Sequence, residues 1–210
     1  MKIKICGLRR IEDVEYANEA RPDYIGFILT PGYKRSITKE TAWDLKKKLS
    51  PDIRAVGVFV NEDPTVIAGY LKEGIIDMAQ LHGSESDEDI LRIRDLTGKS
   101  LIKMVKAERR EDIERAFSLE ADYILFDSGA GTGMTFDRSE LKTYLEEQGY
   151  FKDPGLFKRF FIAGGITSEN IREVYEDIKP FGVDISGGVE TDGVKDSEKM
   201  KKAVEMSRQL

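Results

Sequence analysis

Short apolar segments recur along this chain at a nearly constant interval. Each is rich in Ile, Val, Leu or Phe and ends near a turn residue, which is typical of the buried strands of a parallel sheet. Most of them begin about 22 to 24 residues after the previous one begins. The segments expected to form strands are 2–6, 24–29, 54–60, 76–81, 100–105, 122–127, 159–163 and 181–186.

The stretches between these segments have the periodicity and charge of surface helices. Examples are IEDVEYANEA at 11–20, KETAWDLKKKLS at 39–50 and the charged run at 87–96. Residues suited to the beginning of a helix stand ahead of several of them. We expect Thr38, Ser86 and Ser168 to be N-caps and Pro64 to occupy a first helical position.

Strands that alternate with helices of this length must run parallel, because each helix returns the chain to the same end of the sheet. Eight such units can close into a (β/α)8 TIM barrel, and 210 residues suffice for one with few insertions. We therefore predict a single-domain barrel over residues 1–210, with an open doubly wound sheet as the structural alternative. The longer step from 122 to 159 predicts an extended loop at 128–137 before its helix.

Composition narrows the functional classes. The formal net charge is -6 and basic residues are scattered, which disfavours nucleic-acid binding. A single cysteine excludes an internal disulfide and a Cys-rich zinc site, and indicates a reducing compartment such as the cytoplasm. The sequence shows neither a signal peptide nor a membrane-spanning segment, so we expect no membrane partner.

Two residues at strand ends could carry chemistry. In a parallel barrel the active site lies at the C-terminal ends of the strands, where Cys6 and Asp127 are expected. Considered alone, a cysteine at a strand end such as Cys6 is more often a small buried apolar residue than a reactive group, and Asp127 could cap a loop or helix. Their shared position makes them candidates for an acid and a base.

Two glycine pairs follow the last two predicted strands. Gly164-Gly165 follows the seventh and Gly187-Gly188 follows the eighth. Glycine pairs let backbone amides approach an anion closely, and barrels often bind phosphate with these two loops. The alternative is that both pairs only form tight turns.

Three further features are weaker. Gly129, Gly131 and Gly133 predict either a mobile loop over the site or an insertion without function. Arg35 could bind a carboxylate through two hydrogen bonds, or could simply be solvated. His82 is the only histidine and could be structural, and we find no residue set that predicts a metal site.

The chain resembles the phosphoribosylanthranilate isomerase family of tryptophan biosynthesis, and the resemblance extends over nearly its whole length. Each matching stretch is short, but their order and spacing make the match specific. The stretches are KICG at 4–7, GFIL and KRSI within 26–37, VGVFVN at 56–61, QLHG at 80–83, LFD at 125–127, TFD at 135–137, AGGI and EN within 163–170, and VDISGGVE at 183–190.

The resemblance implies an Amadori rearrangement of N-(5-phosphoribosyl)anthranilate to 1-(o-carboxyphenylamino)-1-deoxyribulose 5-phosphate, without cofactor or metal. It assigns Cys6 as the general base and Asp127 as the general acid. Arg35 would lie beside the anthranilate carboxylate. The remaining substrate-binding positions implied are His82 and the phosphate-site residues Gly164, Gly165, Asp184, Ser186, Gly187 and Gly188.

This chemistry sets requirements for both groups. The acid must hold a proton for the ribose ring oxygen, so we expect Asp127 to lie in a partly dry site. The base acts as a thiolate, so we expect the pKa of Cys6 to lie below its usual value of ~8.5. The sequence leaves the oligomeric state open, with a homodimer as one alternative.

Two other functions compete with this interpretation. A histidine-pathway isomerase performs the same chemistry on another phosphoribosyl compound, but it would have an aspartate where this chain has Cys6. A barrel that binds phosphosugars without catalysis would not need both Cys6 and Asp127. Within the resemblance, SGGVE replaces the frequent SSGVE, and Met134 and Arg138 stand where lysine and tryptophan are frequent.

Overall fold

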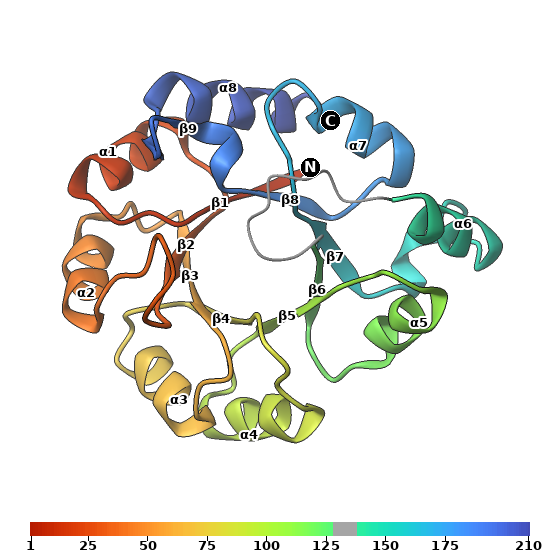
Figure 1. The fold of residues 1–210 in the computed structure, drawn as a ribbon, viewed down its shortest axis with the longest axis horizontal. Coiled ribbons are helices and arrows are strands. Elements are labelled where there is room, and N and C mark those ends of the chain that lie inside the picture. The colour runs from red at the N-terminus through yellow and green to blue at the C-terminus, as the bar shows by residue number, and fades with distance from the viewer. Residues whose placement is uncertain (128–137) are drawn as a thin grey trace.

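The computed structural model describes residues 1–127 and 138–210. Eight parallel strands form a closed barrel in the order of the chain, and β1 pairs with β8 to complete the ring. Figure 1 shows this ring with the helices arranged around it. The predicted barrel is confirmed, and the open doubly wound sheet is excluded because the closing pair is present. The strands are β1 Lys2–Cys6, β2 Tyr24–Ile28, β3 Arg54–Phe59, β4 Met78–Leu81, β5 Leu101–Val105, β6 Tyr123–Phe126, β7 Arg159–Ile162 and β8 Gly182–Ile185.

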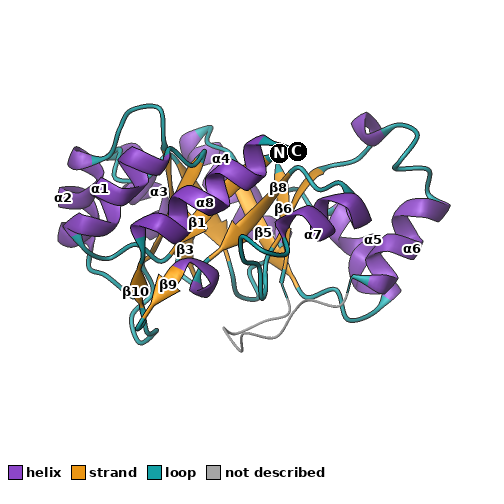
Figure 2. Ribbon diagram, turned by 90° about the horizontal axis from the view of Figure 1, so that it is seen from above, coloured by secondary structure: helices purple, strands orange, loops and turns teal. Residues whose placement is uncertain are grey.

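Helices follow the strands and cover the outside of the barrel. They are α1 Ile11–Ala20, α2 Lys39–Lys48, α3 Pro64–Lys72, α4 Asp87–Thr97, α5 Arg110–Ser118, α6 Ser139–Glu147, α7 Ile171–Ile178 and α8 Ser197–Arg208. Short 3-10 helices lie at η1 Pro154–Leu156 and η2 Gly187–Val189, and an antiparallel hairpin is formed by β9 Glu190–Thr191 and β10 Val194–Lys195. Figure 2 shows the hairpin at the end of the barrel away from the N- and C-termini. The two termini lie together, where the Met1 ammonium donates to Ser207 O at 3.1 Å.

Most predicted helix starts are confirmed. Thr38 and Ser86 cap α2 and α4, each accepting a backbone N–H of the first turn, and Pro64 begins α3. The prediction for Ser168 is wrong, because α7 begins after Asn170. Asn170 accepts from Thr167 N and donates to Gly165 O, both at 2.9 Å, so a turn that follows the glycine pair delays the helix.

The extra length between β6 and β7 is not confined to the stretch before α6. Residues 148–158, after the helix, include η1 and pack Tyr150 and Phe157 against Phe160 and Phe117. The predicted loop at 128–137, with Gly129, Gly131 and Gly133, lies outside the described residues. The interpretation of that loop as a cover over the site therefore stays a prediction.

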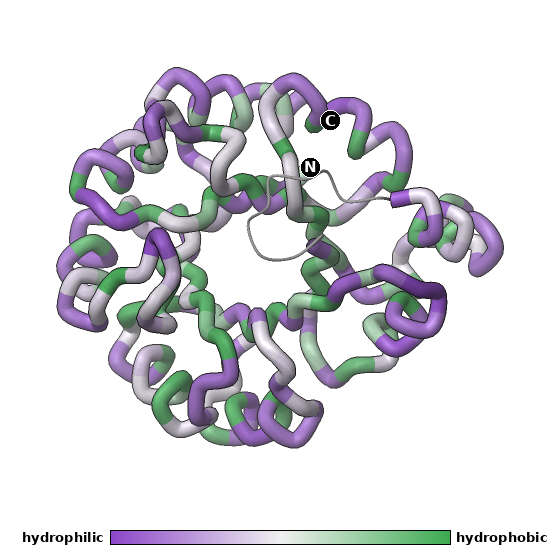
Figure 3. Tube along the Cα trace, viewed as in Figure 1, coloured by the Kyte–Doolittle hydropathy of each residue, from purple (hydrophilic) through white to green (hydrophobic). Residues whose placement is uncertain are grey.

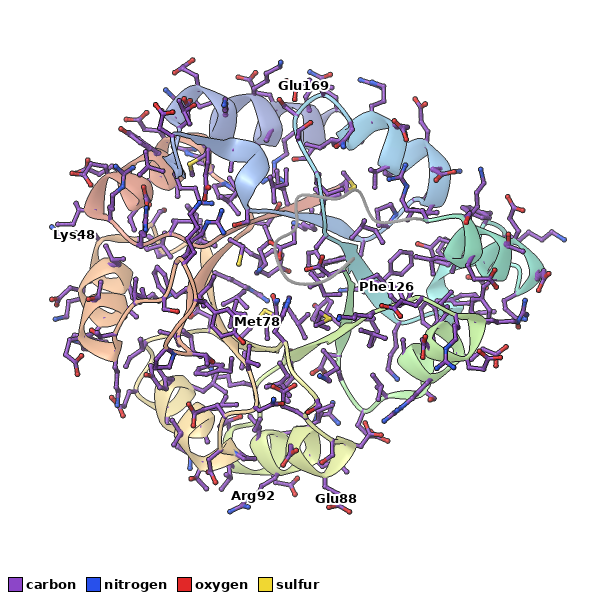
Figure 4. All side chains as sticks on the ribbon, in the orientation of Figure 1. Lys48, Met78, Glu88, Arg92, Phe126 and Glu169 are labelled. Carbon is purple, nitrogen blue, oxygen red and sulfur yellow. The ribbon has the colours of Figure 1, made fainter. Side chains whose placement is uncertain are left out.

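The alternation of side chains along each strand creates two separate apolar layers. Residues such as Ile3, Ile5 and Phe126 pack between the strands and the helices, while Val56 and Met78 belong to the cluster inside the barrel. Figure 4 shows Met78 within the ring and Phe126 on the side of α5 and α6. In Figure 3 the hydrophobic positions follow the strands and the polar ones the outer surface of the helices.

Aromatic rings fill the N-terminal end of the barrel. Tyr24 and Phe161 meet edge to face with ring centroids 5.7 Å apart, and Phe181 lies 5.4 Å from Phe161. Arg159 lies over the Phe181 ring at 5.2 Å. With this end closed by side chains, the polar residues inside the barrel gather toward the C-terminal ends of the strands.

None of the helices in the described ranges is long and apolar enough to cross a membrane.

Candidate active site

The Cys6 thiol occupies the end of β1, and only 9% of the residue is exposed. The backbone after it turns over β2, because the amides of Gly7 and Leu8 both donate to Gly26 O, at 2.9 and 3.1 Å. A Cβ added at Gly26 would lie 2.6 Å from Cys6 Sγ. The absence of a side chain at Gly26 therefore leaves the space that the sulfur occupies.

The environment of Cys6 does not lower its pKa as the sequence analysis expected. Burial raises the pKa of the thiol, because a thiolate loses its hydration there. The Lys4 ammonium opposes this, and the Asp184 carboxylate adds to it. The expectation was wrong because the packing that encloses the sulfur outweighs the positive charge beside it.

Arg35 does not lie free in solvent. Its Nε and Nη2 donate to Glu190 Oε1 and Oε2 at 2.6 and 2.8 Å, a two-point contact that fixes the plane of the guanidinium. Its aliphatic part crosses Gly7, where an added Cβ would lie 2.5 Å from Arg35 Cδ. Arg35 is thus placed directly beside the end of β1.

Glu190 has a second cationic partner. Lys195, which is 3% exposed, donates to Glu190 Oε1 at 3.0 Å and to Ser186 O at 2.9 Å. Burial alone would raise the pKa of Glu190, but its hydrogen bonds with Arg35 and the charge of Lys195 lower that pKa to about 2. Glu190 is therefore ionised, and it joins the Arg35 loop to the segment after β8.

His82 follows β4 and Asp127 follows β6, whereas Cys6 ends β1. In the ring of eight strands, the first two residues therefore lie across the barrel from Cys6. His82 Nε2 is 3.7 Å from Asp127 Oδ2. On its other side, His82 Nδ1 lies 2.8 Å from Gln80 Nε2. His82 is thus held between Gln80 and Asp127.

Burial lowers the pKa of His82, although the nearby Asp127 charge opposes that shift. The imidazole is therefore neutral at pH 7. Leu125 on β6 belongs to the interior cluster, so Asp127, two residues further on, faces the interior at the end of the barrel where Cys6 lies. A base and an acid can thus reach a molecule held between them.

The two glycine loops touch each other. Gly164 and Gly165 both have left-handed φ, at 86° and 64°. A Cβ on Gly188 would overlap the Ile166 carbonyl oxygen, so the loops after β7 and β8 meet backbone to backbone. Ser186 Oγ donates to Cys6 O at 3.0 Å, which joins this paired-loop region to the end of β1.

Asp184 lies deeper in the barrel than the glycine loops. Its Oδ2 accepts from Lys4 Nζ at 2.7 Å, and both residues are almost fully buried. Four residues of this site were not predicted from the sequence: Lys4, Glu190, Lys195 and Gln80. The period of two along KIKIC could have placed Lys4 on the face of Cys6, but no local signal pairs it with a residue 180 positions away.

Within residues 1–127 and 138–210, no three His, Cys, Asp or Glu side chains gather as they would around a metal ion. The arrangement instead combines a buried thiol, a carboxyl beside a neutral imidazole, an arginine held in one plane and two loops with closely spaced amides. Such a set can move protons on a small molecule that carries a phosphate and a carboxylate.

Comparisons with known proteins agree with one family. The family model described as N-(5'phosphoribosyl)anthranilate (PRA) isomerase matches residues 3–206. The N-(5'-phosphoribosyl)anthranilate isomerase of Lachnoclostridium phytofermentans is 41% identical over 207 residues, which cover 96% of this chain and 94% of the relative.

Solved structures of the same family have the same fold. Monomers generated from the dimeric Thermotoga maritima phosphoribosylanthranilate isomerase align with a TM-score of 0.84 at 32% identity, covering 100% of both chains. A phosphoribosylanthranilate isomerase in complex with reduced 1-(o-carboxyphenylamino)-1-deoxyribulose 5-phosphate also gives a TM-score of 0.84 at 32% identity, with 100% of both chains covered.

Proposed function

This chain belongs to the N-(5'-phosphoribosyl)anthranilate isomerase family, and from that premise we propose which residues carry its reaction. The chain is an isomerase of tryptophan biosynthesis that converts N-(5'-phosphoribosyl)anthranilate to 1-(o-carboxyphenylamino)-1-deoxyribulose 5-phosphate. Cys6 is the general base and Asp127 the general acid. The observation that supports these assignments is that Cys6 ends β1 and Asp127 directly follows β6, both on the inward side of the same end of the barrel.

The acid acts first. Asp127 gives its proton to the ribose ring oxygen, the bond from that oxygen to C1′ breaks, and the anthranilate nitrogen lone pair forms an iminium with C1′. The neutral His82, whose Nε2 lies 3.7 Å from Asp127 Oδ2, contacts the substrate beside the acid and stabilises the carboxylate that remains.

The base acts on the iminium. The Cys6 thiolate takes the C2′ hydrogen, the C–H electron pair becomes the C1′=C2′ bond, and the iminium electrons return to nitrogen. The resulting enolamine becomes the ketone when C1′ gains a proton and the C2′ hydroxyl loses one. No atom is gained or lost overall, as an isomerisation requires.

The substrate's two anionic groups are held apart from the reacting carbons. The amides of Gly164, Gly165, Gly187 and Gly188, with Ser186, bind the phosphate, and Asp184 lies below this site with its charge balanced by Lys4. Arg35 binds the anthranilate carboxylate. Arg35 Nε and Nη2 both donate to the Glu190 carboxylate, so the Nη1 edge of the Arg35 guanidinium is the one presented to the substrate.

The test follows the loss of anthranilate fluorescence as freshly made phosphoribosylanthranilate turns over. Cys6→Ala and Asp127→Asn should each lower kcat by about 10²- to 10⁴-fold, the usual contribution of a positioned acid or base. Asp95→Asn, at an exposed position of α4, should keep the parent activity and serves as the matched control.

Full activity in either variant at the site would disprove that residue's role. A parent chain that binds the product but shows no turnover would instead indicate a barrel that binds phosphosugars without catalysis. These two outcomes differ in the parent measurement, so they cannot be confused.

We further propose that residues 1–210 act as one catalytic domain in the cytoplasm. The single cysteine supports a reducing compartment. Limited proteolysis should leave no smaller fragment with activity, and cell fractionation checks the location.

The chain is also proposed to form a homodimer. Support comes from the dimeric state named for the Thermotoga maritima relative. Light scattering coupled to size exclusion should give twice the mass of the 23.8 kDa chain, and a monomer mass at micromolar concentration would refute the proposal.

A further inference from the structure

An ion pair lies inside the barrel, beside a cluster of apolar side chains. Lys4 Nζ and Asp184 Oδ2 are 2.7 Å apart, and the Lys4 residue is 0% exposed. The neighbouring interior cluster includes Val56, Met78 and Leu125. Asp184 Oδ1 is buried as well and has no hydrogen-bond partner among the described residues.

Stability does not account for this pair. Removing two charges from water costs several kcal/mol per ion, and replacing a buried pair by apolar residues of similar volume is often neutral or stabilising. The unpartnered Asp184 Oδ1 adds to the cost, since a buried acceptor without a donor is unfavourable. A charged pair at this depth therefore calls for a role in the reaction.

Lys4 lies directly below the thiol. Lys4 and Cys6 are two residues apart on β1, so both side chains point into the barrel. The Lys4 ammonium lowers the pKa of the Cys6 thiol, against the effect of burial. Among the cations that lower the pKa of the Cys6 thiol, Lys4 has the largest effect and Lys195 a smaller one.

The charged groups that face Cys6 come from several elements. Lys4 is on β1, Asp184 on β8, Lys195 on β10 and Arg35 in the loop after β2. Glu190 is shared by Arg35 and Lys195, and Asp184 is bound to Lys4. Three cations thus face two carboxylates, which leaves one positive charge that a Cys6 thiolate would neutralise.

We propose that Lys4, held by Asp184, is a positioning residue that stabilises the thiolate of Cys6 with its ammonium charge. The proposal rests on the proposed role of Cys6 as the general base. When the thiol gives up its proton to solvent, Lys4 keeps its own and remains an ammonium. When the thiolate takes the C2′ hydrogen, the sulfur becomes neutral again and the ion pair with Asp184 is unchanged.

The lone cysteine makes this directly measurable. Every thiolate signal in the chain comes from Cys6, so ultraviolet absorbance and the rate of alkylation by iodoacetamide report its ionisation as the pH is varied. The double substitution Lys4→Met with Asp184→Leu removes both charges and leaves no unpaired buried ion. We expect the titration midpoint to rise, because Lys4 lowers the pKa of the thiol more than Asp184 raises it. The rise should be smaller than the roughly one to three pH units that an adjacent opposite charge alone produces, because Asp184 is removed as well.

Met78→Leu is the matched control, because it changes packing in the barrel interior without changing charge. It should leave the midpoint of the parent. The double variant should lose about tenfold or more in kcat at neutral pH and recover part of that loss as the pH is raised. A folded double variant whose thiol titrates at the parent midpoint would overturn the proposal.

A second measurement needs no change at Lys4. The NMR signal of the Lys4 ammonium nitrogen in the parent should shift with pH at the midpoint of the thiol titration, and this shift should vanish in Cys6→Ala. Persistence of the shift in Cys6→Ala would also overturn the proposal. Failure of the general-base assignment would appear separately, as an active Cys6→Ala variant.

Discussion

The guanidinium of Arg35 and the carboxylate of Glu190 form a two-point contact, with Nε to Oε1 at 2.6 Å and Nη2 to Oε2 at 2.8 Å. The residues are 155 positions apart and come from the loop after β2 and the start of β9. The contact gives the guanidinium a fixed plane beside Cys6. In the role proposed for Arg35, this contact orients the guanidinium before the substrate carboxylate arrives.

Glu190→Gln should weaken substrate binding more than it slows the chemistry. The amide keeps the shape of Glu190 but leaves Arg35 and Lys195 without their shared counter-charge, so Arg35 is no longer held in one plane. We expect KM to rise by about tenfold with a smaller change in kcat. Steady-state kinetics on the parent and variant check this, and a fall in kcat with KM unchanged would contradict it.

The same carboxylate makes stability depend on acid pH. The pKa of Glu190 lies at about 2 in the folded chain, below its ordinary value of 4.5, so the unfolded chain binds the extra proton first. The stabilisation from Glu190 is present above about pH 4.5 and is lost as the pH falls toward 2. Urea unfolding of the parent should show a steeper loss over that window than unfolding of Glu190→Gln.

Gly26→Ala should displace the thiol. The added Cβ would lie 2.6 Å from Cys6 Sγ and 3.2 Å from Cys6 Cα, too close for either to stay in place. Overpacking of this kind costs about 1–3 kcal/mol of stability. We expect circular dichroism to show a folded barrel and steady-state kinetics to show a kcat/KM well below that of the parent. Parent activity would mean that the position of the sulfur is not critical.

Gly188→Ala should separate the two glycine loops. Its Cβ would overlap the Ile166 carbonyl oxygen, which belongs to backbone and cannot rotate away. Inorganic phosphate should then compete with the substrate more weakly, and KM should rise. Gly69→Ala is the control: it sits in α3 with its nearest neighbour 3.9 Å away and should add about 0.5–1 kcal/mol of stability without changing KM.

His82 should titrate below its ordinary value. Burial lowers the pKa of this residue, and the Asp127 charge opposes the shift, so Asp127→Asn should lower the midpoint further. His82 is the only histidine, and one imidazole proton resonance in NMR therefore reports the whole titration. A midpoint at or above 6.5 in the parent would contradict the burial argument.

The lowered pKa of His82 also has a consequence for stability. Below pH 6.5 the His82 imidazole is protonated in the unfolded chain but stays neutral in the folded chain, where its pKa is lower. The free energy of unfolding therefore falls as the pH decreases through that region. His82→Gln should remove this component, and thermal unfolding between pH 7 and 5 compares the two chains.

Residues that follow a local period were predictable from the sequence. The strand positions 2–6 and 181–186 and the caps Thr38 and Ser86 depend on spacing within one or two elements. The number of strand and helix units follows from the repeated interval between them. Ser168 failed because the side chain of Asn170 shapes the turn after Gly165 and moves the start of α7. A serine ahead of a helical pattern cannot report that competing turn.

What surrounds Cys6 was decided only by the tertiary structure. The alternation in KIKIC points Lys4 and Cys6 to one side, yet it does not reveal that Lys4 meets Asp184 from β8 or that burial raises the pKa of the thiol. Arg35 likewise finds Glu190 only because the chain closes on itself. Hydrophobic periodicity is a local property that the sequence carries openly, whereas ion pairing and desolvation depend on which distant residues the closed barrel brings together.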